Sequence, residues 1–191
     1  NDPTEFSHRN DAFYAQYKAG TMNIWEYIRF ATEPLCRFGA IKSEATHALF
    51  MRDVVQKVIQ PEALALVRQH QAAGDAVIIV TATNEFVTRS IAQIFGVTDL
   101  MAVNLARDPV SGWFNGEILG TPSFREGKVT RVQEWLTSRG LNWTDVQSTF
   151  YSDSINDLPL LEQVTHPVAT NPDERLRAIA KTRGWRILEL F

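Results

Sequence analysis

The sequence predicts an α/β protein: a doubly wound parallel sheet (a Rossmann-like core) with an all-helical cap inserted near the N-terminus. Short apolar, β-branched segments recur along residues 60–191, and amphipathic stretches of helical spacing separate them. This alternation predicts parallel strands that are connected by helices. Residues 1–59 differ, because they contain helical patterns and no strand signal. We therefore expect two units, a helical cap of residues 1–59 and an α/β core of residues 60–191.

The core pattern begins with a helix. Pro61 suits a first helical turn, and Gly74 suits the end of that helix. The apolar run Ala-Val-Ile-Ile-Val over residues 76–80 is typical of a buried parallel strand. The expected order is helix 61–73, strand 76–81, helix 84–95, strand 100–104, a turn at 108–112, a returning strand 113–118, helix 126–139, strand 149–151, helix 158–163, strand 166–169, helix 173–182 and strand 185–190.

The N-terminal part predicts three helices. Gly20 would end the first, and Asn23 with Glu26 three residues on resembles a capping box for the second. Residues 43–59 suit the third. We expect these helices to cover the carboxyl ends of the core strands and to close over a substrate. The first helix carries an aromatic stripe that we expect to pack mostly inside the cap and not to face substrate: Phe6, Phe13, Tyr14 and Tyr17.

Composition excludes several classes of protein. The chain has 191 residues, of which 45% are hydrophobic and 21% charged, so it can bury a core and is not a disordered chain. Cys36 is the single cysteine, which excludes an internal disulfide and a thiolate metal cluster. The net charge is −3 and no long basic run occurs, so we expect no nucleic-acid partner. No apolar run is long enough for a membrane span and no signal segment opens the chain, so we expect a cytoplasmic protein.

The strongest chemical signal is the segment Tyr-Ser-Asp-Ser-Ile-Asn-Asp at residues 151–157, which follows a short strand and opens a helix. Ligands of parallel sheets bind beyond the carboxyl ends of the strands, which is where Asp153 would lie. Asp157 follows four residues later and could reach the same site. Two carboxylates at a strand end suit Mg²⁺, which takes few protein ligands and retains waters and phosphate oxygens. The alternative is an Asx turn with a helix cap, which the same residue types favour.

Two further positions suit a phosphate group. Thr81 would end the strand of residues 76–81, and its hydroxyl, with Thr83 and the first N–H groups of the next helix, could hold phosphate oxygens. Lys128 would lie at a helix start, where the helix dipole disfavours a cation, so it is a candidate to be held there for an anion. The alternatives are an ordinary strand-end threonine and a solvated lysine. The four histidines are scattered, and we interpret them as surface or hydrogen-bonded structural residues: His8, His47, His70 and His166.

Taken together and in order, these segments resemble motifs two, three and four of the haloacid-dehalogenase-like hydrolases. The similarity is greatest to the phosphoserine-phosphatase-like subfamily, in a bacterial branch that includes histidinol-phosphate phosphatases. Members insert a helical cap between motifs one and two, as residues 1–59 would, and carry a hairpin before the lysine motif, which residues 108–120 resemble. The segments that carry the resemblance are Thr81-Ala-Thr-Asn84, Phe124-Arg-Glu-Gly-Lys128 and Tyr151-Ser-Asp-Ser154.

The resemblance implies a Mg²⁺-dependent phosphomonoesterase that acts on a small phosphorylated metabolite through an aspartyl-phosphate intermediate. Histidinol phosphate and phosphoserine are the candidate substrates. Thr81 and Lys128 would be catalytic, the first by hydrogen bonding the phosphoryl group and the second by neutralising its charge. Thr83 and Asn156 would also bind phosphate. Asp153 would ligate Mg²⁺, and Asp157 would ligate it through water or orient Asn156 and Lys128.

One feature of the family's pattern is missing. Its first motif, Asp-x-Asp-x-Thr on the first strand, supplies the nucleophile and the acid/base, and this sequence contains no Asp-x-Asp. We expect that strand upstream of residue 1, within roughly 20–30 residues, the length of a strand, a loop and a helix start. The alternatives are a catalytically inactive binding or regulatory domain, and a transferase or dehalogenase on the same core. Family dehalogenases use no metal, so loss of activity in a chelator would favour the phosphatase.

Overall fold

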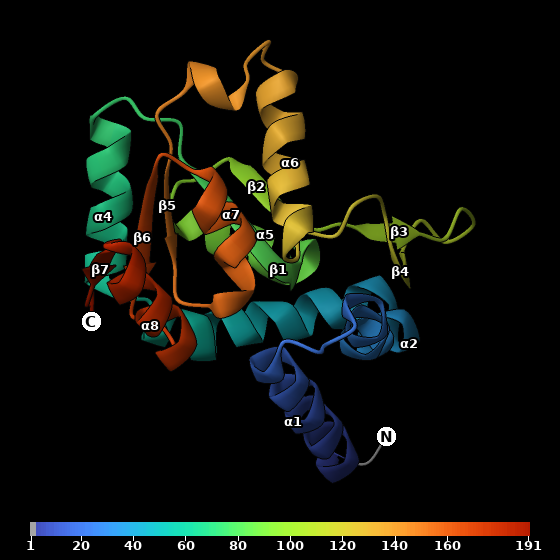
Figure 1. The fold of residues 1–191 in the computed structure, drawn as a ribbon. Helices are drawn as coiled ribbons and strands as arrows, with labels where there is room; N and C mark the ends of the chain where they lie inside the picture. The colour runs from blue at the N-terminus through green and yellow to red at the C-terminus, as the bar shows by residue number, and fades with distance from the viewer. Residues whose placement is uncertain (1–2) are drawn as a thin grey trace.

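A computed structural model describes residues 3–191, so the first two residues of the expected cap lie outside the described residues. Figure 1 shows helices α1 and α2 across one end of the strands, with the other long helices beside the strands. The helical region comprises α1 (Pro3–Ala19), α2 (Ile24–Phe50), a π-helical segment η1 (Met51–Val55) and α3 (Gln56–Val58). This helical region followed by parallel strands is the mixed α/β architecture that the sequence predicts.

The strands and helices of the core alternate as expected, with shifted ends. They are α4 (Pro61–Ala72), β1 (Ile78–Asn84), α5 (Glu85–Ile94), β2 (Asp99–Val103), β3 (Leu105–Arg107), β4 (Phe114–Ile118), α6 (Glu126–Thr137), η2 (Trp143–Asp145), β5 (Thr149–Ser152), η3 (Ile155–Asp157), α7 (Leu158–Gln163), β6 (His166–Thr170), α8 (Glu174–Arg183) and β7 (Arg186–Leu188).

Local chemistry explains several helix ends. The side chain of Asn23 accepts hydrogen bonds from the backbone N–H groups of Trp25 and Glu26, which confirms the expected cap of α2. Within α2 the backbone departs from helical geometry at Gly39, where φ is 70°. Glycine tolerates this left-handed value, so α2 consists of two helical parts that meet at Gly39. The sequence predicts a third helix from residue 43, four residues after this break at Gly39.

The strands form two parallel sheets and one hairpin. β1 pairs in parallel with β2, β5 pairs in parallel with β6, and β6 pairs in parallel with β7. Among residues 3–191, no strand pairing joins β1 to β5, so each of these two strands has one unpaired edge. β3 and β4 form an antiparallel hairpin around the expected turn. The sequence analysis extended the second strand to residue 104 and missed β3, whose three residues depend on their pairing with β4.

Two buried clusters hold the helices of one face on the strands. Val132 and Leu136 of α6 pack with Met101 of β2 and Leu160 of α7. A second cluster joins α7, β6 and α8 through four fully buried residues: Leu161, Ala169, Leu176 and Ala180. Helix α4 lies beside α5. Its Gln71 side chain donates hydrogen bonds to backbone carbonyls at the end of α5. Helices thus pack on both sides of the strands, as a doubly wound fold requires.

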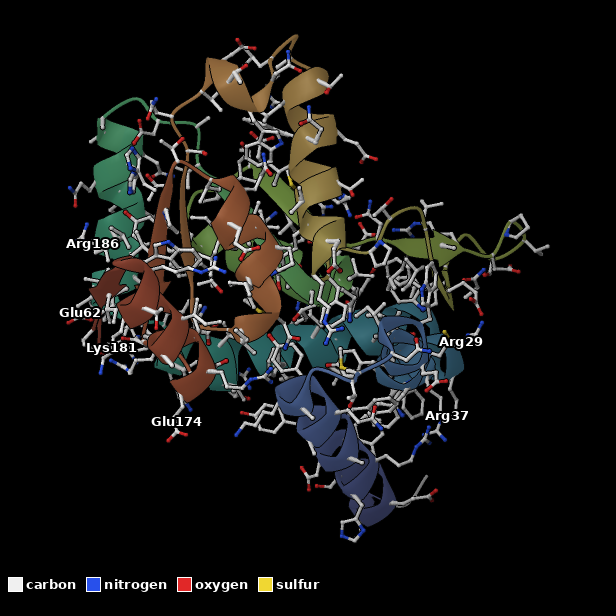
Figure 2. The ribbon with its side chains drawn as sticks, in the orientation of Figure 1. Arg29, Arg37, Glu62, Glu174, Lys181 and Arg186 are labelled. Atoms are coloured by element: carbon white, nitrogen blue, oxygen red, sulfur yellow. The ribbon has the colours of Figure 1, made fainter. Side chains whose placement is uncertain are left out.

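The first part of α2 is anchored on the β3–β4 hairpin. Ile28 is fully buried, and it belongs to one cluster with Val103, Leu105 and Phe114. At the rim of this contact, Arg29 donates two hydrogen bonds to Glu117 of β4, at 3.0 and 3.2 Å, and Figure 2 shows Arg29 beside the hairpin. The helical region and the core therefore share apolar core residues.

Candidate active site

A cavity of about 470 Å³ lies between the helical region and the ends of β1 and β5. The core side contributes the last residues of β1, Lys128 of α6, and the segment at the end of β5. The helical region contributes a wall without charged side chains: Asn10, Phe13, Tyr14, Tyr17, Met22 and Tyr27. The helices thus cover the carboxyl ends of the strands, where ligands of parallel sheets bind.

Thr81 and Thr83 line this cavity from β1. β1 pairs with β2 in regular register from Ile78 to Val80, and the register shifts before Asn84. Thr81 is therefore the first residue after the regular pairing, within a strand that continues to Asn84. The backbone N–H of Thr83 donates to the Thr81 hydroxyl at 3.2 Å. This contact turns the segment towards the cavity and leaves the hydroxyl hydrogen of Thr81 available for an anion.

Lys128 is the buried cation of the site. It lies in the first turn of α6, and its Nζ stands 2.6 Å from Oδ1 of Asp157. The two side chains are only 6% and 10% exposed. Asp157 also accepts a hydrogen bond from the Ser152 hydroxyl at 2.8 Å, so each of its carboxylate oxygens has a partner. This ion pair is the contact that an orienting role of Asp157 towards Lys128 requires, and the role itself stays a prediction.

Gly127 allows the loop before α6 to close tightly. A Cβ atom at this position would lie 2.0 Å from the carbonyl oxygen of Pro122, which no side chain can tolerate. Gly127 has no left-handed backbone angle, so the requirement is for space. Its small size lets the loop of residues 121–125 fold over the start of α6 and fixes where Lys128 enters the cavity.

Asp153 lies directly after β5 and lines the cavity with an exposed side chain. Protein atoms on its inner side remove part of its hydration, and this desolvation raises the pKa of its carboxyl. The negative charges of Asp157 and Asp173 raise this pKa further, while Lys128 lowers it. Asp173 also fixes this loop, because its carboxylate accepts the N–H of Ile155 at 2.9 Å and its own N–H donates to the Asp153 carbonyl.

The donor set fits a Mg²⁺ ion that keeps most of its own waters. Among residues 3–191, no three His, Cys, Asp or Glu side chains gather in a ready-made metal cluster. Mg²⁺ in phosphate-handling sites needs only one or two carboxylates, with water and phosphate completing its octahedron. Asp153 supplies one carboxylate at the cavity, beside the threonines of β1.

Asn156 is engaged within the protein. Its side-chain oxygen accepts from Nε of Arg125 at 3.2 Å, and its side-chain nitrogen donates to the carbonyl of Tyr17 at 2.9 Å. It is buried and does not belong to the residues that line the cavity. Its assignment to phosphate binding stays a prediction, as do the roles of the other site residues.

The aromatic stripe of α1 divides between packing and the cavity. Phe6 and Phe13 stack on Phe30, with ring centroids 4.6 and 5.1 Å apart, as expected. Phe13 also lines the cavity, together with Tyr14 and Tyr17, so the expectation that the stripe mostly avoids the substrate side is wrong for these three residues. The Tyr17 hydroxyl donates to Ser154 at 2.7 Å, and desolvation raises the pKa of this tyrosine. A tyrosine within a phenylalanine stripe signals that one end of the side chain needs a polar partner.

Tyr27 and Asn10 also line the cavity and were missed, because neither stands in a motif. His70 lies in α4, where its ring nitrogens contact the Asp75 carboxylate at 2.7 Å and the Tyr151 hydroxyl at 2.9 Å. It is therefore a hydrogen-bonded structural histidine, as the sequence analysis interpreted it.

This site defines a class of protein. Threonine hydroxyls, a buried ammonium group and a carboxylate line one cavity at the ends of parallel strands, which is the donor chemistry that a phosphate-type anion requires. The family model for haloacid dehalogenase-like hydrolases matches residues 7–162. The chain belongs to this family.

Similar proteins agree with this assignment. A histidinol-phosphatase of Neisseria meningitidis serogroup C is 38% identical over 188 residues, which cover 98% of this chain and 84% of that protein. A crystal structure of a protein of unknown function from Bordetella pertussis Tohama I is 45% identical, with a TM-score of 0.92 over 100% of this chain and 85% of that one. A probable phosphoserine phosphatase from Vibrio cholerae shares the fold at 16% identity, with a TM-score of 0.66 over 95% of this chain and 51% of that one. The enzyme class that the family and its phosphatase relatives support is a phosphoric monoester hydrolase.

No helix among the described residues is long and apolar enough to cross a membrane.

Proposed function

We propose that this protein is a Mg²⁺-dependent, cytoplasmic phosphatase that hydrolyses histidinol phosphate through an aspartyl-phosphate intermediate. The observation that carries the proposal is the convergence of Thr81, Lys128 and Asp153 on one cavity whose opposite wall is neutral and aromatic. Residues 1–59 act as the cap over that cavity, and residues 60–191 act as the catalytic core. The similarity to a histidinol-phosphatase over nearly the whole chain supports this choice of substrate.

The core side of the cavity binds the phosphoryl group. The Thr81 hydroxyl and the Thr83 segment donate hydrogen bonds to its oxygens, and Lys128 offsets the negative charge that gathers on them. Asp157 and Ser152 hold the Lys128 ammonium group in place. Asp153 would hold Mg²⁺, which when bound supplies further positive charge to the phosphate. A carboxylate attacks phosphorus, the leaving alcohol takes a proton from a neighbouring acid, and water then hydrolyses the aspartyl phosphate.

The attacking carboxylate belongs to the Asp-x-Asp strand, for which the split sheet offers a place. The unpaired edges of β1 and β5 border the same cavity, since residues 80–83 and 150–153 both line it. Each unpaired backbone group in a buried sheet costs about 1–3 kcal/mol, so a strand between these edges would be strongly stabilised. We propose that a segment upstream of residue 1 fills this position and presents its aspartates next to Thr81 and Asp153.

The neutral wall of the cap favours histidinol phosphate over phosphoserine. Phosphoserine carries a carboxylate, which binding sites usually pair with an arginine or lysine. Lys128 is the one basic side chain among the described residues of the cavity, and Asp157 already pairs with it. Histidinol phosphate has an imidazole side chain where phosphoserine has that carboxylate, and like phosphoserine it carries an ammonium group. Both groups can lie on the faces of Tyr14 and Tyr27, because aromatic rings attract cations and stack with flat rings.

Phosphate release tests the proposal directly. The full translation product and the 191-residue chain are incubated with histidinol phosphate or phosphoserine, each with Mg²⁺ and with a chelator. We expect the full product to hydrolyse histidinol phosphate faster than phosphoserine, and to lose activity in the chelator. The 191-residue chain alone should be inactive. Activity that survives the chelator, or equal rates with both substrates, would contradict the proposal.

A second candidate function is a non-catalytic phosphate-binding or regulatory domain. The absence of Asp-x-Asp from the 191 residues is the observation that favours it. Such a domain would bind a phosphorylated metabolite at the same cavity and release no phosphate. Tight binding of histidinol phosphate by a full translation product that does not hydrolyse it would identify this function.

A further inference from the structure

The C-terminal end of α1 is held on the core by polar contacts. The Tyr17 hydroxyl donates to Ser154, and the Tyr17 carbonyl accepts from the side chain of Asn156. Arg125 donates from one terminal nitrogen to the carbonyl of Gly20. These acceptors include carbonyls at the end of a helix, where the helix dipole is negative and a guanidinium group is favourable.

Arg125 joins this helix end to the loop after β5. Its Nε donates to the side-chain oxygen of Asn156 at 3.2 Å, while its terminal nitrogen holds Gly20 in the turn between α1 and α2. One guanidinium group therefore connects the helical region with the loop that carries Asp153 and Asp157. Its rigid planar fork fixes the directions of both hydrogen bonds, which the compact ammonium group of a lysine does not.

The contacts continue from Arg125 and Asn156 to the buried cation. The backbone N–H of Asn156 donates to the Ser154 hydroxyl, and the backbone N–H of Ser154 donates to the Ser152 hydroxyl, both at 3.2 Å. Ser152 in turn donates to Asp157, which pairs with Lys128. A connected set of polar contacts thus links the turn after α1 to the ammonium group of the phosphate site.

The backbone at Arg125 supports a special role for this side chain. Its φ is 50° and its ψ is −122°, a conformation that normally favours glycine. Strained backbone of this kind persists only where surrounding contacts determine it, and such positions cluster at functional sites. Arg125 stands three residues before Lys128, so its backbone also determines how the chain enters α6.

We propose that Arg125 is a positioning residue that holds the tyrosine wall of α1 at a fixed distance from the phosphate site. It is not among the residues that line the cavity. It acts through Gly20 and Asn156, and it sets where Tyr14 and Tyr17 meet the leaving group. This inference rests on the proposed function, because it assigns the leaving group to the wall formed by α1. It predicts that Arg125 controls the affinity for the whole substrate and leaves the affinity for phosphate alone unchanged.

Arg125→Gly tests this role, since glycine removes the guanidinium group and accepts the backbone conformation. Arg175→Gln is the matched control, because Arg175 donates to the carbonyl of Lys18 at the same end of α1 but makes no bond to Asn156. We expect Arg125→Gly to raise KM for histidinol phosphate at least tenfold. The inhibition constant of inorganic phosphate, which occupies only the core side, should change less than threefold. Arg175→Gln should change both constants less than threefold.

Amide hydrogen exchange provides a readout that does not depend on activity. Peptides covering residues 10–20 should exchange at least tenfold faster in Arg125→Gly than in the wild-type chain, while peptides covering β5 stay protected. Arg125→Lys, which keeps the charge and the long side chain, should recover only part of this protection.

Equal protection in Arg125→Gly and the wild type would overturn the proposal. Parallel changes in KM and in the phosphate inhibition constant would also overturn it, because they would indicate a general structural role. If the wild-type protein hydrolyses no substrate, the proposed function fails, and hydrogen exchange still decides whether Arg125 positions α1.

Discussion

Replacing Lys128 by methionine should both destabilise the protein and impair its chemistry. The Lys128–Asp157 pair has side chains that are 6% and 10% exposed, so the substitution leaves a nearly buried carboxylate without its cation. Removing one partner of a buried pair costs about 3–5 kcal/mol. In a protein of this size, each kcal/mol lowers Tm by about 2–4 °C, so Tm should fall by roughly 6–20 °C. Urea denaturation measures the free energy of unfolding, and calorimetry measures Tm.

A second substitution separates charge from packing. In the double variant Lys128→Met with Asp157→Asn, no unpaired charge remains and the amide oxygen can still accept the Ser152 hydroxyl. Most of the lost stability should return. Activity should not return, because one charge-stabilising group commonly contributes about 10²–10³ in kcat. Lys128→Arg should also fail to restore full activity, since a planar guanidinium group cannot replace the compact ammonium charge. If the free energy of unfolding of the Lys128→Met variant lies within about 1 kcal/mol of the wild-type value, the argument is refuted.

Three further substitutions test other parts of the structure. In Asp153→Asn, Mg²⁺-dependent turnover should disappear. Because burial raises the folded-state pKa of Asp153, its contribution to stability is fully present below its ordinary value of 3.8 and is lost as pH rises through the raised value. Without metal, Asp153→Asn should therefore melt above wild type at pH 7 and level with it below pH 3.8, as calorimetry over a pH series would measure. Gly127→Ala should lower Tm and kcat, because its Cβ would stand 2.0 Å from the Pro122 carbonyl; an unchanged Tm would show that the loop can yield. Arg29→Ala should leave the midpoint of urea denaturation nearly unchanged, because its pair with Glu117 is exposed and surface pairs contribute little.

The core strands were predictable because their signals are local. The apolar run before Thr81 predicts a buried strand, and the parallel topology then places Thr81 and Asp153 at the same end of the sheets. The strand β3 was missed, since its three residues are stabilised by pairing with β4 and carry no pattern of their own. Spacing identified Lys128 and Asp157 separately, the family resemblance implied that Asp157 could orient Lys128, and the fold joins them as an ion pair.

The partners of Asn156 could not be predicted. It stands 31 residues from Arg125 and 139 residues from Tyr17, and no periodic pattern links positions at such separations. A polar residue in a motif predicts that some polar partner exists without identifying it. The neutral wall of α1 and α2 likewise depends on tertiary packing, because which face of an aromatic helix is covered is decided by the surface it meets.

The helical region does not behave as one uniform lid. The first part of α2 carries the fully buried Ile28 and shares an apolar cluster with the β3–β4 hairpin, so separating it from the core would expose core side chains to water. Helix α1 has no buried side chain among residues 4–19, and polar contacts near Tyr17 hold its end on the core. Segments with few buried apolar contacts open at the lowest free-energy cost. Opening of the cavity should therefore begin at α1 while the first part of α2 stays in place. The contacts that must break are those of Arg125 and Asn156 and the stacks of Phe6 and Phe13 on Phe30.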